Sequence, residues 1–217
     1  HRPQHQSKKK PSLSGEQIRR IIENTPEDYR PLFLVAAITG LRLGEILALR
    51  WENVDFDNRR LAITHNLWRG QLVSPKTEAS LRTFSLIPEL ANVFRAQRQK
   101  STFTQDDDFV FARLEGSPYD PDHLRNVVLY PALERAGIER SAREFGFHIF
   151  RHSAGSIVHA ATRDLKLAQE LLGHARISTT SDTYIHVSEE VAGEAVKILA
   201  REVNWPLIVP QESDQIQ

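Results

Sequence analysis

The spacing of apolar residues changes twice along this chain, and these changes limit the folds that it can adopt. As far as Trp51, apolar side chains recur at helical spacing. From Val54 the chain continues in short β-prone runs separated by turn residues. After Pro88 helical spacing returns and persists to about Ala200. This order predicts an α+β fold, mainly helical, that carries one small antiparallel sheet.

Local signals place the first helices. Ser14 followed by Gln17 has the form of a capping box, so we expect a helix to begin there. The apolar run "PLFLVAAITG" predicts a buried helix that ends near Gly40, and "LGEILALRW" predicts that a helix restarts just beyond Arg42.

Turn residues divide the central region. The Asp57-Asn58 pair separates two β-prone runs, and Gly70 with a polar loop separates further runs. After a helix over 88–100 we expect a short strand at 108–112, then a helix over 121–137. The acidic run at 106–108 is typical of a solvated turn rather than a two-metal site.

Composition excludes several classes of protein. The 28 basic and 28 acidic residues balance, so a basic site must be local rather than a property of the whole chain. No cysteine is present, which excludes disulfides, a thiolate nucleophile and cysteine-ligated zinc. No run has the roughly 18 apolar residues of a membrane span, and no signal peptide opens the chain, so we expect a cytoplasmic protein.

The chain contains no methionine, even at position 1, so we expect a piece of a longer protein. Residues 1–12, with their run of three lysines and a proline, are expected to be a linker remnant, and 13–203 the catalytic domain. Residues 204–217 contain an apolar patch, Trp205 to Val209, which predicts a tail that packs on its own domain or on a neighbouring subunit.

Several polar residues are candidates for chemistry, each with a plainer alternative. Arg42 precedes Glu45 by three residues, a spacing that also suits a purely structural ion pair. Lys76 lies in a polar loop, where most lysines are solvated. His174 follows a glycine and suits a helix cap, and Tyr184 suits a buried core residue.

The stretch "HIFRHSAGS" brings three more candidates together. His148 and Arg151 share a helix face, and His152 lies one turn after His148. Histidines at this spacing bind zinc in some enzymes, but here no glutamate follows the first histidine and no cysteine assists, so we expect no metal.

Together these residue types suit attack on a phosphodiester. Paired arginines stabilise the charge that develops on the non-bridging oxygens and can replace a metal ion. A tyrosine nucleophile needs an acceptor for its proton, and the departing alkoxide needs a donor, roles that histidine and lysine can fill.

Four segments, in order, resemble the catalytic domain of the tyrosine recombinases, or phage integrases, from about Leu13 to about Ala200. They are "TGLRLGEILALRW", "SPKTEASLRTFSL", "HIFRHSAGS" and "LLGHARISTTSDTYIHV". Ile149, Phe150 and Ser153 depart from the usual second box, and Pro75 precedes the lysine where many members have a polar residue. None of these departures removes a catalytic group.

The resemblance implies roles for six catalytic residues and two supporting ones. Arg42 and Arg151 would clamp the phosphate, Lys76 would be the general acid and His148 the general base. His174 would support the phosphate and Tyr184 would be the nucleophile. Glu45 would orient the site. His152 would support the catalytic groups without contacting the phosphate itself.

The same resemblance implies partners. These are double-stranded DNA and, in the full-length protein, a homotetramer on two DNA sites within the bacterial nucleoid, with no cofactor, metal or membrane. The isolated fragment is expected to be monomeric without DNA. The reaction would integrate or excise a mobile element. Chromosome dimer resolution of the Xer type, type IB topoisomerase-like activity and a non-catalytic DNA-binding accessory role remain alternatives.

Overall fold

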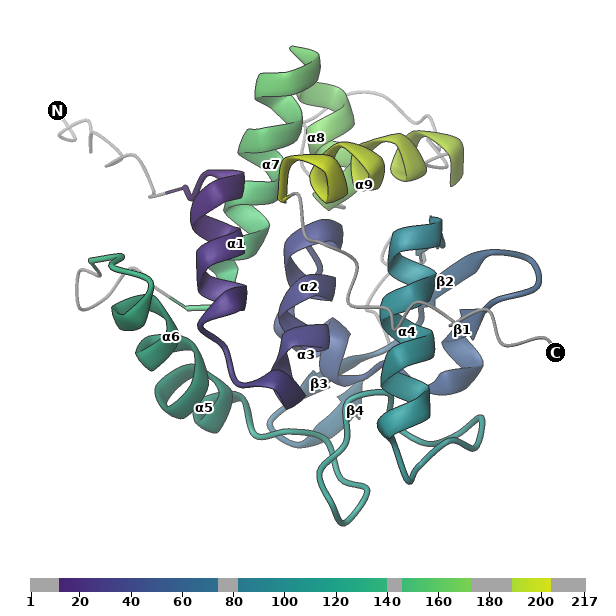
Figure 1. Cartoon of the computed structure of the whole chain (residues 1–217). Helices are drawn as coiled ribbons and strands as arrows, with labels where there is room; N and C mark the ends of the chain where they lie inside the picture. The colour runs from purple at the N-terminus through teal and green to yellow at the C-terminus, as the bar shows by residue number, and fades with distance from the viewer. Residues whose placement is uncertain (1–11, 74–81, 140–145, 173–188, 204–217) are drawn as a thin grey trace, which may run out of the picture.

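A computed structural model describes residues 12–73, 82–139, 146–172 and 189–203. Helix α2 (Arg30–Thr39) lies in the middle and contacts α1 (Gly15–Glu23), α4 (Pro88–Lys100), α7 (His148–Thr162) and α9 (Glu189–Val203). In Figure 1, α7, α8 (Leu165–Leu172) and α9 gather above α2, and α4 and the labelled strands lie below them; α9 also contacts the last strand, β5 (Arg82–Ser85).

The remaining elements are short. Along the chain they are the 3₁₀ turns η1 (Glu27–Tyr29) and η2 (Trp51–Asn53), the helices α3 (Leu43–Leu47), α5 (Pro121–His123) and α6 (Tyr130–Arg135), the π-helical turn η4 (Leu124–Leu129), and the strands β1 (Val54–Asp55), β2 (Arg60–Ile63), β3 (Asn66–Trp68), β4 (Gln71–Val73) and β5 (Arg82–Ser85).

The N-terminal helices confirm the sequence-based predictions. The Ser14 hydroxyl accepts a hydrogen bond from the Gln17 N–H at 3.2 Å, and the Gln17 side chain accepts one from the Ser14 N–H at 2.9 Å, which completes the capping box. Helix α2 ends at Gly40, whose φ of 62° is the left-handed conformation that glycine adopts readily. Helix α3 is shorter than predicted, although Leu49 beyond its end is still buried.

The predicted antiparallel sheet is present in two parts. Strands β1, β2 and β5 form a three-stranded sheet, in which Leu61 pairs with Val54 on one side and Phe84 on the other. Strands β3 and β4 form a separate hairpin. That hairpin lies directly against α3, because a methyl group added at Gly44 would come within 2.6 Å of the Leu67 carbonyl oxygen.

The strand predicted at 108–112 is wrong. Phe109 and Ala112 form only isolated bridges, to Arg50 and Pro118. The apolar character that suggested a strand reflects burial in the core, where Val110 and Phe111 are inaccessible. The Val110 N–H donates to the Leu49 carbonyl, and the Gln97 amide donates to the Val110 carbonyl, so core contacts rather than a ladder satisfy this backbone.

The helix predicted over 121–137 ends at Arg135 and contains a π-helical turn. Pro131 has no N–H, so it cannot donate to the carbonyl of Val127 four residues before it. Just before the proline, the Tyr130 N–H bonds five residues back, to the Arg125 carbonyl. The wider turn therefore accommodates the proline without ending the helix.

Aromatic side chains pack α2 against α7. The Phe33 ring meets Phe147 at a centroid distance of 5.0 Å and Phe150 at 5.6 Å, both edge to face, and Phe33 and Phe150 are fully buried.

Among the residues described, no helix has the length and apolar character needed to cross a bilayer.

Replacing Phe33 by alanine should lower the free energy of unfolding by about 3–5 kcal/mol, because the vacated ring volume leaves a cavity between α2 and α7. Urea denaturation followed by circular dichroism measures the change. Val127→Ala, at a side chain that is 57% exposed, is the control and should change stability by less than about 0.5 kcal/mol. Equal losses for the two variants would show that this interface is not part of the core.

Candidate active site

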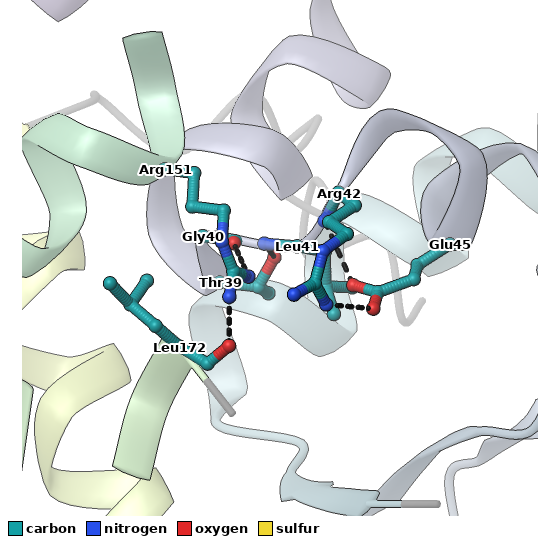
Figure 2. A network of polar contacts seen from close by, with 7 residues as sticks. All are labelled: Thr39, Gly40, Leu41, Arg42, Glu45, Arg151 and Leu172. Carbon is teal, nitrogen blue, oxygen red and sulfur yellow. Dashed lines mark hydrogen bonds and ion pairs between the residues drawn. The ribbon is translucent and has the colours of Figure 1, made fainter. Parts of the chain in front are cut away.

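Arg42 is the residue that precedes α3, and Glu45 holds it in two ways. The Glu45 carboxylate accepts one hydrogen bond from the Arg42 backbone N–H and another from its Nη1, each at 2.8 Å. The Glu45 side chain is only 10% exposed, whereas that of Arg42 is 43% exposed. The carboxylate therefore fixes the guanidinium from the interior, and the cation faces outward (Figure 2).

Arg151 is almost fully buried, at 3% exposure. From α7 its Nη1 donates to the Gly40 carbonyl at 2.8 Å, and its Nη2 donates to the carbonyl of Leu172. Gly40 ends α2 and Leu172 is the last residue of α8, so both acceptors lie where helix dipoles leave partial negative charge. Hydrogen bonds to these two helix ends therefore offset part of the free-energy cost of burying the cation.

Both arginines meet at one turn. The Thr39 hydroxyl donates to the Val35 carbonyl at 2.6 Å and accepts from the Leu41 N–H at 3.2 Å, which fixes the chain as it leaves α2. Arg151 donates a hydrogen bond to this turn at the Gly40 carbonyl. Arg42 follows two residues later, after the buried Leu41. Figure 2 shows the two guanidinium groups on the two sides of the turn. Arg42 and Arg151, which are far apart in the sequence, are thus both placed by the turn that follows α2.

His148 begins α7 and is exposed, and His152 is half-buried one turn later. Their ring centroids lie 6.5 Å apart, which confirms that the two rings share a face. In the described part of the chain, no three residues of the metal-ligating types lie close enough together to hold an ion.

Lys76, His174 and Tyr184 lie outside the described residues. The structure gives the elements that flank them: β4 ends at Val73 and β5 begins at Arg82, and α8 ends at Leu172 while α9 begins at Glu189. Their roles stay predictions.

A cavity of about 760 Å³ lies elsewhere, and none of the predicted site residues lines it. Its wall includes Tyr29 and Tyr119, whose ring centroids are 5.1 Å apart. Burial raises the pKa of Tyr119 above its ordinary value, and Tyr29 and Asp28 add to this effect. The cavity is therefore distinct from the turn that joins the two arginines.

The backbone acceptors of Arg151 were not predicted. Any residue supplies a carbonyl, so Leu172 carries no signal in its side chain. The one available signal was Gly40, which predicted a helix end and so a set of carbonyls without helical partners.

Replacing Arg151 by lysine should lower the free energy of unfolding by about 1.5–3 kcal/mol, the contribution of one hydrogen bond to a charged group. A single ammonium cannot reproduce the planar fork that spans the Gly40 and Leu172 carbonyls. Denaturant unfolding measures the loss. Arg125→Lys is the matched control, because that guanidinium is exposed and its contacts with Asp122 and Asn126 lie at the surface. A loss no larger than that of the control would contradict a structural role for Arg151.

Known proteins resemble this chain over most of its length. A model of the phage integrase family matches residues 11–190. A tyrosine recombinase XerC-like protein of Caldanaerobacter subterraneus is 30% identical, over 87% of this chain and 53% of its own length. The integrase of Staphylococcus phage L54a is also 30% identical, over 82% of this chain and 55% of its own length. The chain therefore spans about half the length of these curated relatives.

Solved structures agree on the fold. The Tn1549 transposon integrase in complex with a circular intermediate DNA superposes with a TM-score of 0.67 at 18% identity, over 82% of this chain and 64% of that one. An integrase from mycobacterium phage Brujita gives a TM-score of 0.65 at 20% identity, over 92% of this chain and 61% of that one. Because the family model spans well over half of the 217 residues, the chain belongs to the phage integrase family.

Proposed function

We propose that the protein is a site-specific DNA recombinase that cleaves and rejoins double-stranded DNA through a 3′-phosphotyrosyl intermediate, and that it integrates or excises a mobile element. The observation that carries the proposal is the meeting of Arg42 and Arg151 at the turn after α2, in a chain of the phage integrase family. Hydrogen bonds within the protein fix both guanidinium groups. Two fixed cations can stabilise a phosphate whose negative charge increases in the transition state.

In the proposed reaction the Tyr184 hydroxyl oxygen attacks the phosphorus, and the bond from phosphorus to the 5′-oxygen breaks. His148 accepts the proton of the tyrosine, and Lys76 donates a proton to the departing 5′-oxygen. A 5′-hydroxyl from the partner duplex then attacks the phosphotyrosine and releases Tyr184. Because a phosphodiester is exchanged for a phosphotyrosyl ester and back, the cycle requires no ATP, and the two arginines take the place of a metal ion at the phosphate.

The two arginines contribute differently. Arg42 is accessible and held by a carboxylate, so it can contact a phosphate without losing its anchor. Arg151 approaches from the interior at the ends of α2 and α8, where burial strengthens its interaction with an anion. His174 and His152 would support this pair.

DNA is the proposed partner, and solved complexes of the Tn1549 integrase with DNA support it. We also propose a homotetramer on two sites, with the tail 204–217 exchanged between subunits and the linker 1–12 leading from a preceding domain. The net charge is zero, so binding by this chain rests on local cations and should weaken steeply as salt rises.

The covalent intermediate provides the first test. With a chelator present and a pool of nicked duplexes that lose a short fragment after cleavage, the wild-type chain should form an SDS-resistant adduct with DNA. Tyr184→Phe should abolish it, because no phenolic oxygen remains to attack. Tyr119→Phe, at the cavity away from the arginines, is the matched control and should retain the adduct.

No adduct with any duplex, or an adduct that persists in Tyr184→Phe, would contradict the proposed chemistry. Sequencing the trapped DNA separates integration or excision from chromosome dimer resolution of the Xer type. The choice needs this test because a XerC-like tyrosine recombinase and a phage integrase match the chain at the same 30% identity. Relaxation of supercoiled DNA without strand exchange would instead indicate a topoisomerase.

Glu45→Gln should slow adduct formation at saturating DNA by about 10- to 100-fold, the scale of a small misplacement of a catalytic group. Glutamine keeps the size of the side chain but lacks the charge that holds the Arg42 guanidinium. Glu52→Gln, an exposed carboxylate on η2, should leave the rate unchanged. If the two variants reacted equally fast, Glu45 would have no part in placing Arg42.

A further inference from the structure

Ser153 is a fully buried polar residue, at 0% exposure, in the helix that carries His148 and Arg151. It follows Arg151 by two residues, and the proposed chemistry assigns it no role. A buried hydroxyl that makes no hydrogen bond destabilises a protein, so its partners indicate what it does.

The Ser153 hydroxyl joins two distant parts of the chain. Its O–H donates to the Ile149 carbonyl at 2.7 Å, in the first turn of α7. Its oxygen accepts from the Leu13 N–H, also at 2.7 Å, across 140 positions of sequence. A hydroxyl has one hydrogen to donate and two lone pairs, so both bonds are compatible, and each polarises the other.

A second contact fixes the same end of α1 on α9. Gly15 lies so close to the Glu202 carbonyl that a methyl group there would overlap its oxygen. Helix α9 begins at Glu189, five positions after Tyr184. Residues 13–15 therefore contact both the helix that carries His148 and Arg151 and the helix that follows the predicted nucleophile.

We propose that Ser153 is a positioning residue, which transmits the placement of the chain at Leu13 to the first turn of α7 and so to His148 and Arg151. The inference rests on the recombinase function proposed above. By this route, a displacement of the chain at Leu13 alters the rate of strand cleavage, although Leu13 is not a reacting group. The two hydrogen bonds that join Leu13 to Ser153 and Ser153 to Ile149 connect the chain at Leu13 to the first turn of α7.

A second buried hydroxyl, that of Thr25, distinguishes placement of the catalytic groups by Ser153 from a general contribution of Ser153 to the stability of the fold. Thr25 is also buried and donates to a carbonyl four residues earlier, that of Ile21, but it lies after α1 and not in α7. Ser153→Ala and Thr25→Ala are compared with the wild type at a temperature where all three are folded. Noncovalent DNA affinity and the rate of adduct formation at saturating DNA are measured separately.

Ser153→Ala should slow adduct formation at least about tenfold with little change in affinity, because the reacting groups are misplaced rather than lost. Thr25→Ala should keep the wild-type rate, and Ser153→Thr, which retains the hydroxyl, should restore most of it. Gly15→Ala, which forces α1 and α9 apart, should slow the reaction as well and gives the same comparison if Ser153→Ala does not fold.

Equal rates for Ser153→Ala and Thr25→Ala would overturn the positioning role and leave the recombinase function intact. So would a loss confined to affinity. A wild-type chain that forms no adduct would instead reject the proposed function itself, which keeps the two failures apart.

Discussion

The hydrogen bonds of the buried Arg151 guanidinium to the Gly40 and Leu172 carbonyls join three helices at one point. A buried cation is costly in free energy unless it is compensated, and here the ends of α2 and α8 compensate it. The direction of α2, the end of α8 and the start of α7 are therefore interdependent. The hydrogen bond from Arg151 to Gly40 also fixes the turn that bears Arg42, because Gly40 lies two residues before Arg42.

Much of the fold follows from local signals in the sequence. The capping box at Ser14, the end of a helix near Gly40 and the change of apolar spacing at Val54 are each carried by residues close together in the chain, and each was predicted. The strand expected at 108–112 failed for a physical reason. Apolar residues at Val110 and Phe111 show that the segment is buried, but not whether its backbone finds a neighbouring strand.

Sequence reasoning predicted one contact of the candidate site but not the surroundings of its residues. Helical spacing placed Glu45 beside Arg42, and this contact is present. The same reasoning placed His148 and Arg151 on one face without indicating that the first is exposed and the second buried. That difference depends on what α7 packs against. The carbonyls of Gly40 and Leu172 come from segments that no periodicity connects to α7, so only the tertiary structure shows them.

The contact of Gly44 with the β3–β4 hairpin has a steric consequence. Arg42 directly precedes α3, and at Gly44 this helix lies against the Asn66 side chain and the Leu67 carbonyl of β3. A side chain at position 44 would overlap both groups, so the close approach of the hairpin to the start of α3 depends on glycine at this position. The segment that bears Lys76 follows β4 directly, so the same hairpin that packs on the helix after Arg42 is also the point from which the chain leads to the lysine.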